Sequence, residues 1–254
     1  MLIKNKNILL HTIMGATLIF IFLLTIVASF IQRASGFGFG IFVMMFFPFI
    51  LPSYGEATTL SGLLAGTTAL FITLRHYKQI CWRSVAIIIV FNIAASYFAI
   101  EFISSIGNDA MKRCLGVALV AVSLYFLFWE NKISLLLHSK RARAIIGTIS
   151  GIMGGMFAMP GPPVVLYCIG AIKDKMQYMA TLQALSVVFN LFYTTFRIKA
   201  GFLTDSTITY WAIGCGGILI GSFIGAWCFK RISRNTLKKS VCILMIISGI
   251  IAIL

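Results

Sequence analysis

The sequence predicts an all-α, polytopic integral membrane protein, an inverted repeat of two five-segment halves with broken or re-entrant helices. The first observation is composition: 60% of the 254 residues are hydrophobic, 11% are charged, and the mean hydropathy is +1.00. Such a composition leaves little polar material for a soluble domain. The second is a series of apolar segments with short basic connections, and the third is that glycine and proline interrupt two of these segments.

Ten apolar segments follow one another along the chain. A helix needs about 20 residues to cross a bilayer. The second, sixth and seventh segments are clearly shorter, so we expect half-helices or re-entrant hairpins there. The segments cover about residues 8–31, 36–51, 56–74, 82–104, 110–129, 144–159, 161–172, 176–196, 207–229 and 237–254.

The first segment has the appearance of a signal peptide, because Lys4 and Lys6 precede an apolar run. That run continues through Phe30, which is longer than the hydrophobic region of a usual signal peptide. We therefore expect a helix that is retained in the protein.

The two interrupted segments are the most informative part of the sequence. The first reads SGFGFGIFVMMFFPFILP after Ala34, and the second reads GGMFAMPGPPVVLYCIG after Met153. Unwound backbone at membrane depth persists only where protein or a polar cavity satisfies it. Paired breaks at corresponding places in two halves are typical of the binding site of a secondary transporter.

The halves align when the sequence is shifted by 122 or 123 residues. Ala57-Thr58-Thr59-Leu60 then falls on Ala180-Thr181-Leu182-Gln183, and Thr73-Leu74-Arg75 falls on Thr195-Phe196-Arg197. We interpret residues 1–254 as one membrane domain, with repeat 1 at about 8–129 and repeat 2 at about 144–254. An odd number of segments per repeat gives the second copy the opposite orientation and a pseudo-two-fold axis in the membrane plane.

The basic residues predict the orientation of the chain. Fifteen of the 21 Lys and Arg residues fall in connections on one side, and connections rich in these residues face the cytoplasm. Both termini are therefore expected outside. The net charge of +15 is explained by this topology, so a nucleic-acid partner is not expected.

Both breaks are expected to approach the middle of the membrane, from opposite sides. The glycine-rich turn with Arg33 comes from outside, and the Met159–Pro163 turn comes from inside. Each turn precedes a short helix, and unpaired N–H groups at helix starts attract anions. Proline at 162 and 163 suits a first helical turn. The sequence therefore predicts a site for a small anion between the turns.

Candidate substrate-binding residues come from the breaks and from the helices that follow them. Packing between helices is the alternative for the glycines and hydroxyls, and a cytoplasmic connection is the alternative for Arg33. Arg75 and Arg197 end matched helices and are expected to anchor them at the membrane surface. The candidates are Gln32, Arg33, Ser35, Gly36, Gly38, Thr58, Thr59, Gly161, Pro162, Thr181 and Gln183.

Nothing in the sequence predicts an enzyme. The six cysteines lack CxxC spacing, and the three histidines lie near membrane edges without an HExxH motif. We therefore expect no catalytic residue, metal or cofactor. No paired carboxylates mark a proton relay, so the coupling ion is left open.

The interrupted segments resemble those of the TauE/SafE sulfite exporter family of membrane permeases, over nearly the whole chain. The run Gln32–Gly40 is similar to the family's glycine-rich motif, with Phe37 and Phe39 interposed. Gly154-Gly155 through Pro160-Gly161-Pro162-Pro163 is similar to the second signature. The resemblance implies a permease that moves sulfite, sulfonates or small carboxylates without ATP.

The expected function is therefore a secondary transporter of small anions that works by alternating access in the bacterial cytoplasmic membrane. Its partners are the anionic substrate and the lipid bilayer, with a homo-oligomer left open. The alternatives are an anion channel, separable by saturation and counterflow, and an intramembrane enzyme.

Overall fold

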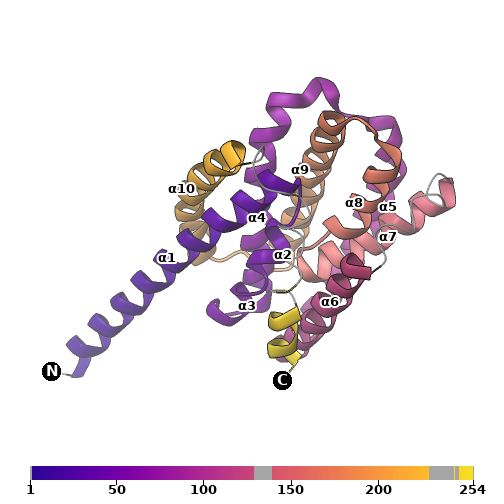
Figure 1. Ribbon diagram of the computed structural model, residues 1–254. Coiled ribbons are helices and arrows are strands. Elements are labelled where there is room, and N and C mark those ends of the chain that lie inside the picture. The colour runs from indigo at the N-terminus through magenta and orange to yellow at the C-terminus, as the bar shows by residue number, and fades with distance from the viewer. Residues whose placement is uncertain (1, 129–138, 229–242, 244–245, 254) are drawn as a thin grey trace.

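The computed structural model describes residues 2–128, 139–228, 243 and 246–253, and every regular element in these ranges is a helix. This confirms the all-α prediction. The last predicted segment and the connection before the sixth lie partly outside the described residues. The elements are α1 (Leu2–Ser35), α2 (Phe39–Val43), α3 (Phe47–Ile50), α4 (Tyr54–His76), the 3-10 turn η1 (Tyr77–Gln79), α5 (Trp82–Ser104), α6 (Asn108–Phe128), α7 (Lys140–Phe157), α8 (Gly161–Ala171), α9 (Lys175–Lys199) and α10 (Asp205–Cys228) (Figure 1).

Within the described ranges, five helices are long and apolar enough to cross a membrane, by length and composition. Phe39–Ile50 and Gly161–Ala171 are shorter apolar helices, at two of the places where the sequence predicts half-helices. Large apolar side chains face outward from the long helices; Phe98, Leu191 and Phe223 are 71%, 66% and 79% exposed. Lipid covers such surfaces without cost, so the fold is that of a multi-pass membrane protein.

Polar side chains at the helix starts fix where three of the helices begin. The Ser53 hydroxyl accepts a hydrogen bond from the Glu56 amide at the start of α4. Ser139 accepts from the Ala142 amide at α7, and Asp174 accepts from two amides at α9. These caps satisfy backbone N–H groups that have no partner inside the helix.

The long helices pair in a reciprocal way. α1 packs along α10, α5 packs along α7, and α4 packs along α9 (Figure 1). In the second half, α7, α9 and α10 are the counterparts of α1, α4 and α5. If each helix is exchanged for its counterpart, the α1–α10 pair becomes the α7–α5 pair, and the α4–α9 pair stays the same. Two copies of one unit around a two-fold axis between α4 and α9 have this pairing.

Rows of glycines bring the reciprocal pairs close together. A Cβ atom at any of these glycines would press on a backbone carbonyl of the facing helix. Small residues at this spacing let helices approach closely in membranes. The rows are Gly147, Gly151 and Gly155 on α7, which face α5, and Gly217, Gly221 and Gly225 on α10, which face α1.

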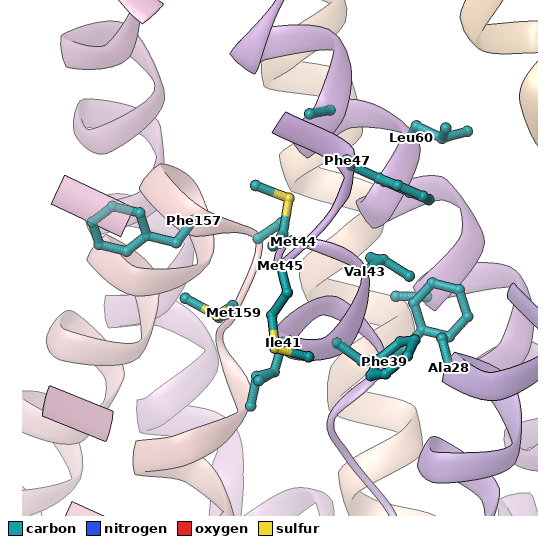
Figure 2. Packing of buried hydrophobic residues seen from close by; sticks show 14 of the residues in the cluster. Ala28, Phe39, Ile41, Val43, Met44, Met45, Phe47, Leu60, Phe157 and Met159 are labelled. Carbon is teal, nitrogen blue, oxygen red and sulfur yellow. The ribbon is translucent and has the colours of Figure 1, made fainter. Parts of the chain in front are cut away.

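The apolar core surrounds the first break. Buried side chains of α2 and α3 pack against α1 and α4 on one side and against the end of α7 on the other. Figure 2 shows Met159 beside Ile41 and Met45, and Phe39 beside Ala28. This packing fixes the short helices in the interior, where the two breaks meet.

Candidate functional site

The two breaks have the same backbone construction, 122 residues apart. At the end of α1, the Gly36 amide donates to the Gln32 carbonyl at 2.8 Å, and at the end of α7, the Ala158 amide donates to the Gly154 carbonyl at 3.0 Å. Gly36 has φ +89° and Ala158 has φ +56°, so both are left-handed. This region is rare for residues with a Cβ, and its use by Ala158 shows that the surrounding structure imposes the turn.

The breaks touch each other through their backbones. A Cβ on Gly40 would collide with the Ala158 carbonyl oxygen, and a Cβ on Gly161 would lie 3.7 Å from the Phe37 Cβ. The first break therefore crosses the second with backbone against backbone at Gly40.

A cavity of about 60 Å³ lies between the two breaks and the middle of α9. A water molecule needs about 10–15 Å³ of such volume, so several waters or one small anion fit. Among the described residues, none that lines the cavity has a charged side chain. Its lining residues are Gln32, Gly36, Phe37, Gly38, Phe39, Gly40, Ile41, Ala65, Ala158, Met159, Pro160, Gly161, Val164, Val165, Leu182, Leu185, Ser186, Phe189 and Asn190.

Two glutamines join the first break to α9. The Gln32 Nε2 donates to the Gln183 Oε1 at 2.9 Å, and the Gln183 Nε2 donates to the Gly36 carbonyl at 2.9 Å. The Gln32 Oε1 is buried and has no hydrogen-bond partner among the described residues. A buried amide oxygen without a partner costs free energy unless a water or ligand bonds to it, so Gln32 is a candidate contact for cavity contents.

The starts of the two short helices differ in the donors they present. The N–H groups of Gly38, Phe39, Gly40 and Ile41 make no hydrogen bond within the described part of the chain. In α8, Pro160, Pro162 and Pro163 occupy three of the four positions whose N–H groups would be free, which leaves the Gly161 amide. The start of α8 therefore offers fewer backbone donors to an anion than the start of α2, because proline lacks the amide hydrogen.

Arg197 is buried completely, and the expectation of an anchor at the membrane surface is wrong. Its Nη1 donates to the Thr58 carbonyl at 3.0 Å, and its Nη2 donates to the Gly154 and Gly155 carbonyls at 2.9 and 3.0 Å. The last carbonyls of a helix lack donors within the helix and carry partial negative charge. The Arg197 guanidinium therefore joins the end of α7 to the first turns of α4 through hydrogen bonds.

A chain of buried hydrogen bonds holds the second break from the other side. The Tyr193 hydroxyl donates to the Asn92 Oδ1 at 2.8 Å, and the Asn92 Nδ2 donates to the Ser150 Oγ at 3.1 Å. The Ser150 hydroxyl then donates to the Pro160 carbonyl at 2.6 Å. α5, α7 and α9 thus fix the turn that forms one wall of the cavity.

The family model described as sulfite exporter TauE/SafE matches residues 21–251 of this chain. The chain belongs to the TauE/SafE sulfite exporter family. No curated protein and no solved structure matches it. The family is one of membrane exporters of sulfite and similar anions. No three His, Cys, Asp or Glu side chains in the described ranges lie close enough together to hold a metal ion.

Four of the predicted site residues of this TauE/SafE protein line the cavity: Gln32, Gly36, Gly38 and Gly161. Gln183 lies directly behind Gln32, and Pro162 is buried beside Gly161. Ser186 and Asn190 also line the cavity. Helical spacing identifies them, because they follow Leu182 by four and eight residues on one face of α9.

Four further predicted residues, Arg33, Thr58, Thr59 and Thr181, are not among the residues that line the cavity. The Thr58 and Thr59 hydroxyls donate to the Gly55 carbonyl, and the Thr181 hydroxyl accepts from the Cys81 amide at 3.0 Å. Arg33 is half-buried, packs against Gly225 and lies close enough to Arg75 for their charges to repel. The Ser35 side chain lies outside the described part of the chain.

Because the Thr181 hydroxyl caps the start of α5, we expect Thr181→Val to act on stability. Leaving the Cys81 amide without its acceptor costs about 1–3 kcal/mol. Thr181→Ser keeps the acceptor and serves as the control. Thermal unfolding in detergent measures the cost, and the uptake rate per folded molecule stays unchanged. A lower rate for folded Thr181→Val would place this hydroxyl on the substrate path instead.

Proposed function

We propose that this protein is a secondary transporter that moves small anions across the bacterial cytoplasmic membrane by alternating access. The substrates are sulfur-containing anions such as sulfite and sulfonates, or small carboxylates. One observation carries the proposal: a small cavity lies where the broken segments of both halves cross, in a chain of the TauE/SafE family. Sites at the junction of two repeats are typical of secondary transporters.

The wall of the cavity supports an anionic substrate. We assign as its donors the amides of Gly38–Ile41, which make no hydrogen bond to another described residue, and the Gly161 amide; the described lining residues include no carboxylate. Oriented amides stabilise negative charge in a water-poor site without a counter-cation. We assign contact with the substrate to Gly36, Gly38 and Gly161, together with Ser186 and Asn190. The free Gln32 Oε1 accepts hydrogen bonds, so we assign it a water in the cavity and not the anion itself. We assign Thr58, Thr59, Thr181 and Gln183 to holding the surrounding helices in place.

The proposed orientation follows the basic residues. Both termini lie outside, and the connection from α4 to α5, with Lys78 in it and Arg83 at the start of α5, faces the cytoplasm. The connection from α9 to α10 then faces outward.

Transport by the purified protein in lipid vesicles tests the function. We expect uptake of sulfite, a sulfonate or a short carboxylate that saturates with concentration and shows counterflow. Flux that rises linearly without counterflow would indicate a channel. Vesicles that move none of these anions in either direction would contradict the proposal.

Filling the cavity is expected to stop transport while the fold survives. Ala65 lines the cavity from α4, and its replacement by leucine places a larger side chain in the space proposed for the substrate. We expect Ala65→Leu to lower the uptake rate by about tenfold or more, since overpacking and exclusion act together. Ala65→Ser, with nearly the original volume, is the control. Wild-type uptake by folded Ala65→Leu would show that the substrate does not use this cavity.

A further inference from the structure

Equivalent arginines in the two halves have different environments. Arg197 near the end of α9 and Arg75 near the end of α4 are 122 residues apart in the repeat. Arg197 is fully buried and donates three hydrogen bonds to the carbonyls of Thr58, Gly154 and Gly155. Arg75 is exposed, and no hydrogen bond joins its side chain to another described residue. The contact between arginine and helix-end carbonyls is thus present at Arg197, near the α9–α10 connection, and absent at Arg75, near the α4–α5 connection, among the described residues.

The connections at the two ends of the protein differ in the same way. Glu56 and Gln177 are the third residues of α4 and α9. The buried Glu56 Oε1 accepts hydrogen bonds from three hydroxyls at the α9–α10 connection: Thr204 at 2.8 Å, Ser206 at 2.6 Å and Thr207 at 3.3 Å. At the α4–α5 connection, the exposed Gln177 Oε1 accepts from the Cys81 thiol at 3.6 Å. Hydroxyl bonds to a carboxylate are much stronger than a thiol bond to an amide.

The cavity extends toward the end with the weaker contacts. The lining follows α8 as far as Val165, but it follows the counterpart helix α2 only as far as Ile41. Five residues between Leu182 and Asn190 on α9 line the cavity, whereas its counterpart α4 contributes only Ala65 among the described residues. α8 leads into the start of α9, and the Tyr167 hydroxyl of α8 donates to the Ser84 carbonyl beside the α4–α5 connection. The cavity therefore leans toward the α4–α5 end and away from Arg197.

We propose that Arg197 and Arg75 are alternating latches, and that the structure is the state closed at the α9–α10 end. In the opposite state, Arg197 leaves the carbonyls of Gly154 and Gly155. Arg75 then takes the equivalent place against the carbonyls of Gln32 and Arg33, 122 residues earlier. The inference rests on the alternating-access part of the proposed function, in which two inverted repeats exchange conformations.

Arg33 biases this exchange. Its positive charge lies in the last turn of α1, at one of the two residues whose carbonyls Arg75 would contact, so it opposes the approach of Arg75 to the end of α1. The second break has Gly155 in the equivalent position and so presents no such charge to Arg197. The latch at the α9–α10 end is therefore the more stable of the two.

Thiol labelling tests the proposal without any substrate. In a variant whose six native cysteines are replaced, Ser186→Cys places one thiol at the cavity wall. A membrane-impermeant maleimide is applied to intact cells and to inside-out vesicles. Lys78→Cys and Lys199→Cys, both exposed, identify which compartment each end faces. We expect the thiol introduced by Ser186→Cys to react from the α4–α5 side.

For three further substitutions, we predict the direction in which labelling of the Ser186→Cys protein changes. Arg197→Gln and Arg33→Gln each raise the labelling of this introduced thiol from the α9–α10 side by about tenfold, the change that one or two hydrogen bonds produce between two states. Arg75→Gln does not raise it. If Arg197→Gln does not fold, Arg33→Gln tests the same shift, because removing this half-buried charge leaves the Arg197 contacts intact.

Unchanged labelling in folded Arg197→Gln and Arg33→Gln would overturn the latch proposal, and so would faster labelling of the Ser186→Cys protein from the α9–α10 side. Because labelling needs no substrate, these outcomes are independent of which anion moves. Absence of anion flux in vesicles, with the predicted labelling shifts present, would contradict the substrate assignment and leave the latches in place.

Discussion

Replacing Gly40 by alanine is expected to unfold this protein or to abolish its transport. The added Cβ would occupy the place of the Ala158 carbonyl oxygen, which belongs to the backbone of the second break. Overpacking a core costs about 1–3 kcal/mol when side chains can shift, and more when backbone must move. The Ala158 turn cannot move easily, since hydrogen bonds to Tyr54, Ser150 and Arg197 fix its neighbours.

Gly161→Ala is the matched control for this prediction. Its Cβ would lie at an ordinary contact distance of 3.7 Å from the Phe37 Cβ, so the added methyl group needs no backbone shift. Yield of monodisperse protein and thermal unfolding compare the two variants. If Gly40→Ala matches Gly161→Ala in both, the breaks do not cross as described.

The second large effect is expected from Asn92→Leu. This substitution leaves the Tyr193 hydroxyl without its acceptor and the Ser150 hydroxyl without its donor, and both groups are buried. Each unsatisfied buried group costs about 1–3 kcal/mol. We expect a large fall in the unfolding temperature and loss of the wall at Pro160, with transport reduced accordingly.

A double-mutant cycle separates the bond from general disruption. Tyr193→Phe removes one hydroxyl and keeps the ring that stacks on Phe189 and contacts Arg197. We expect the double variant with Asn92→Leu to be less destabilised than the sum of the single variants, because their shared bond is lost once. Additive effects would show that the two side chains act independently.

Much of the architecture follows from short-range properties of the sequence. Segment lengths and apolar composition predict the membrane-spanning helices, and Gly36, Gly38 and Pro160 mark the breaks because their backbone chemistry is local. The same breaks predict four cavity-lining residues. This part of the prediction depends on the membrane thickness, which about 20 helical residues span, and on the special conformations of glycine and proline.

The contacts that depend on distant parts of the chain could not be predicted in this way. Arg197 bonds to Thr58 and Gly154, 139 and 43 residues away, and its position near the end of a helix is equally compatible with the surface. The Thr58 hydroxyl bonds within its own helix, although repetition in the two halves favours a cavity role. The directions of the Thr58 and Arg197 side chains depend on how α4 and α9 are aligned along each other, and hydropathy does not predict that alignment.

The reciprocal pairing of α1 with α10 and of α5 with α7 has a consequence for synthesis of the chain. The partner of α1 leaves the ribosome after almost every other helix, so the membrane insertion machinery or lipid must cover that face of α1 in the meantime. The first half alone therefore cannot complete its assembly before translation nears its end. In this arrangement, α1 of the first half pairs with α10 of the second half, and α7 of the second half pairs with α5 of the first. Two separate single-repeat polypeptides would form a dimer through the same pairing.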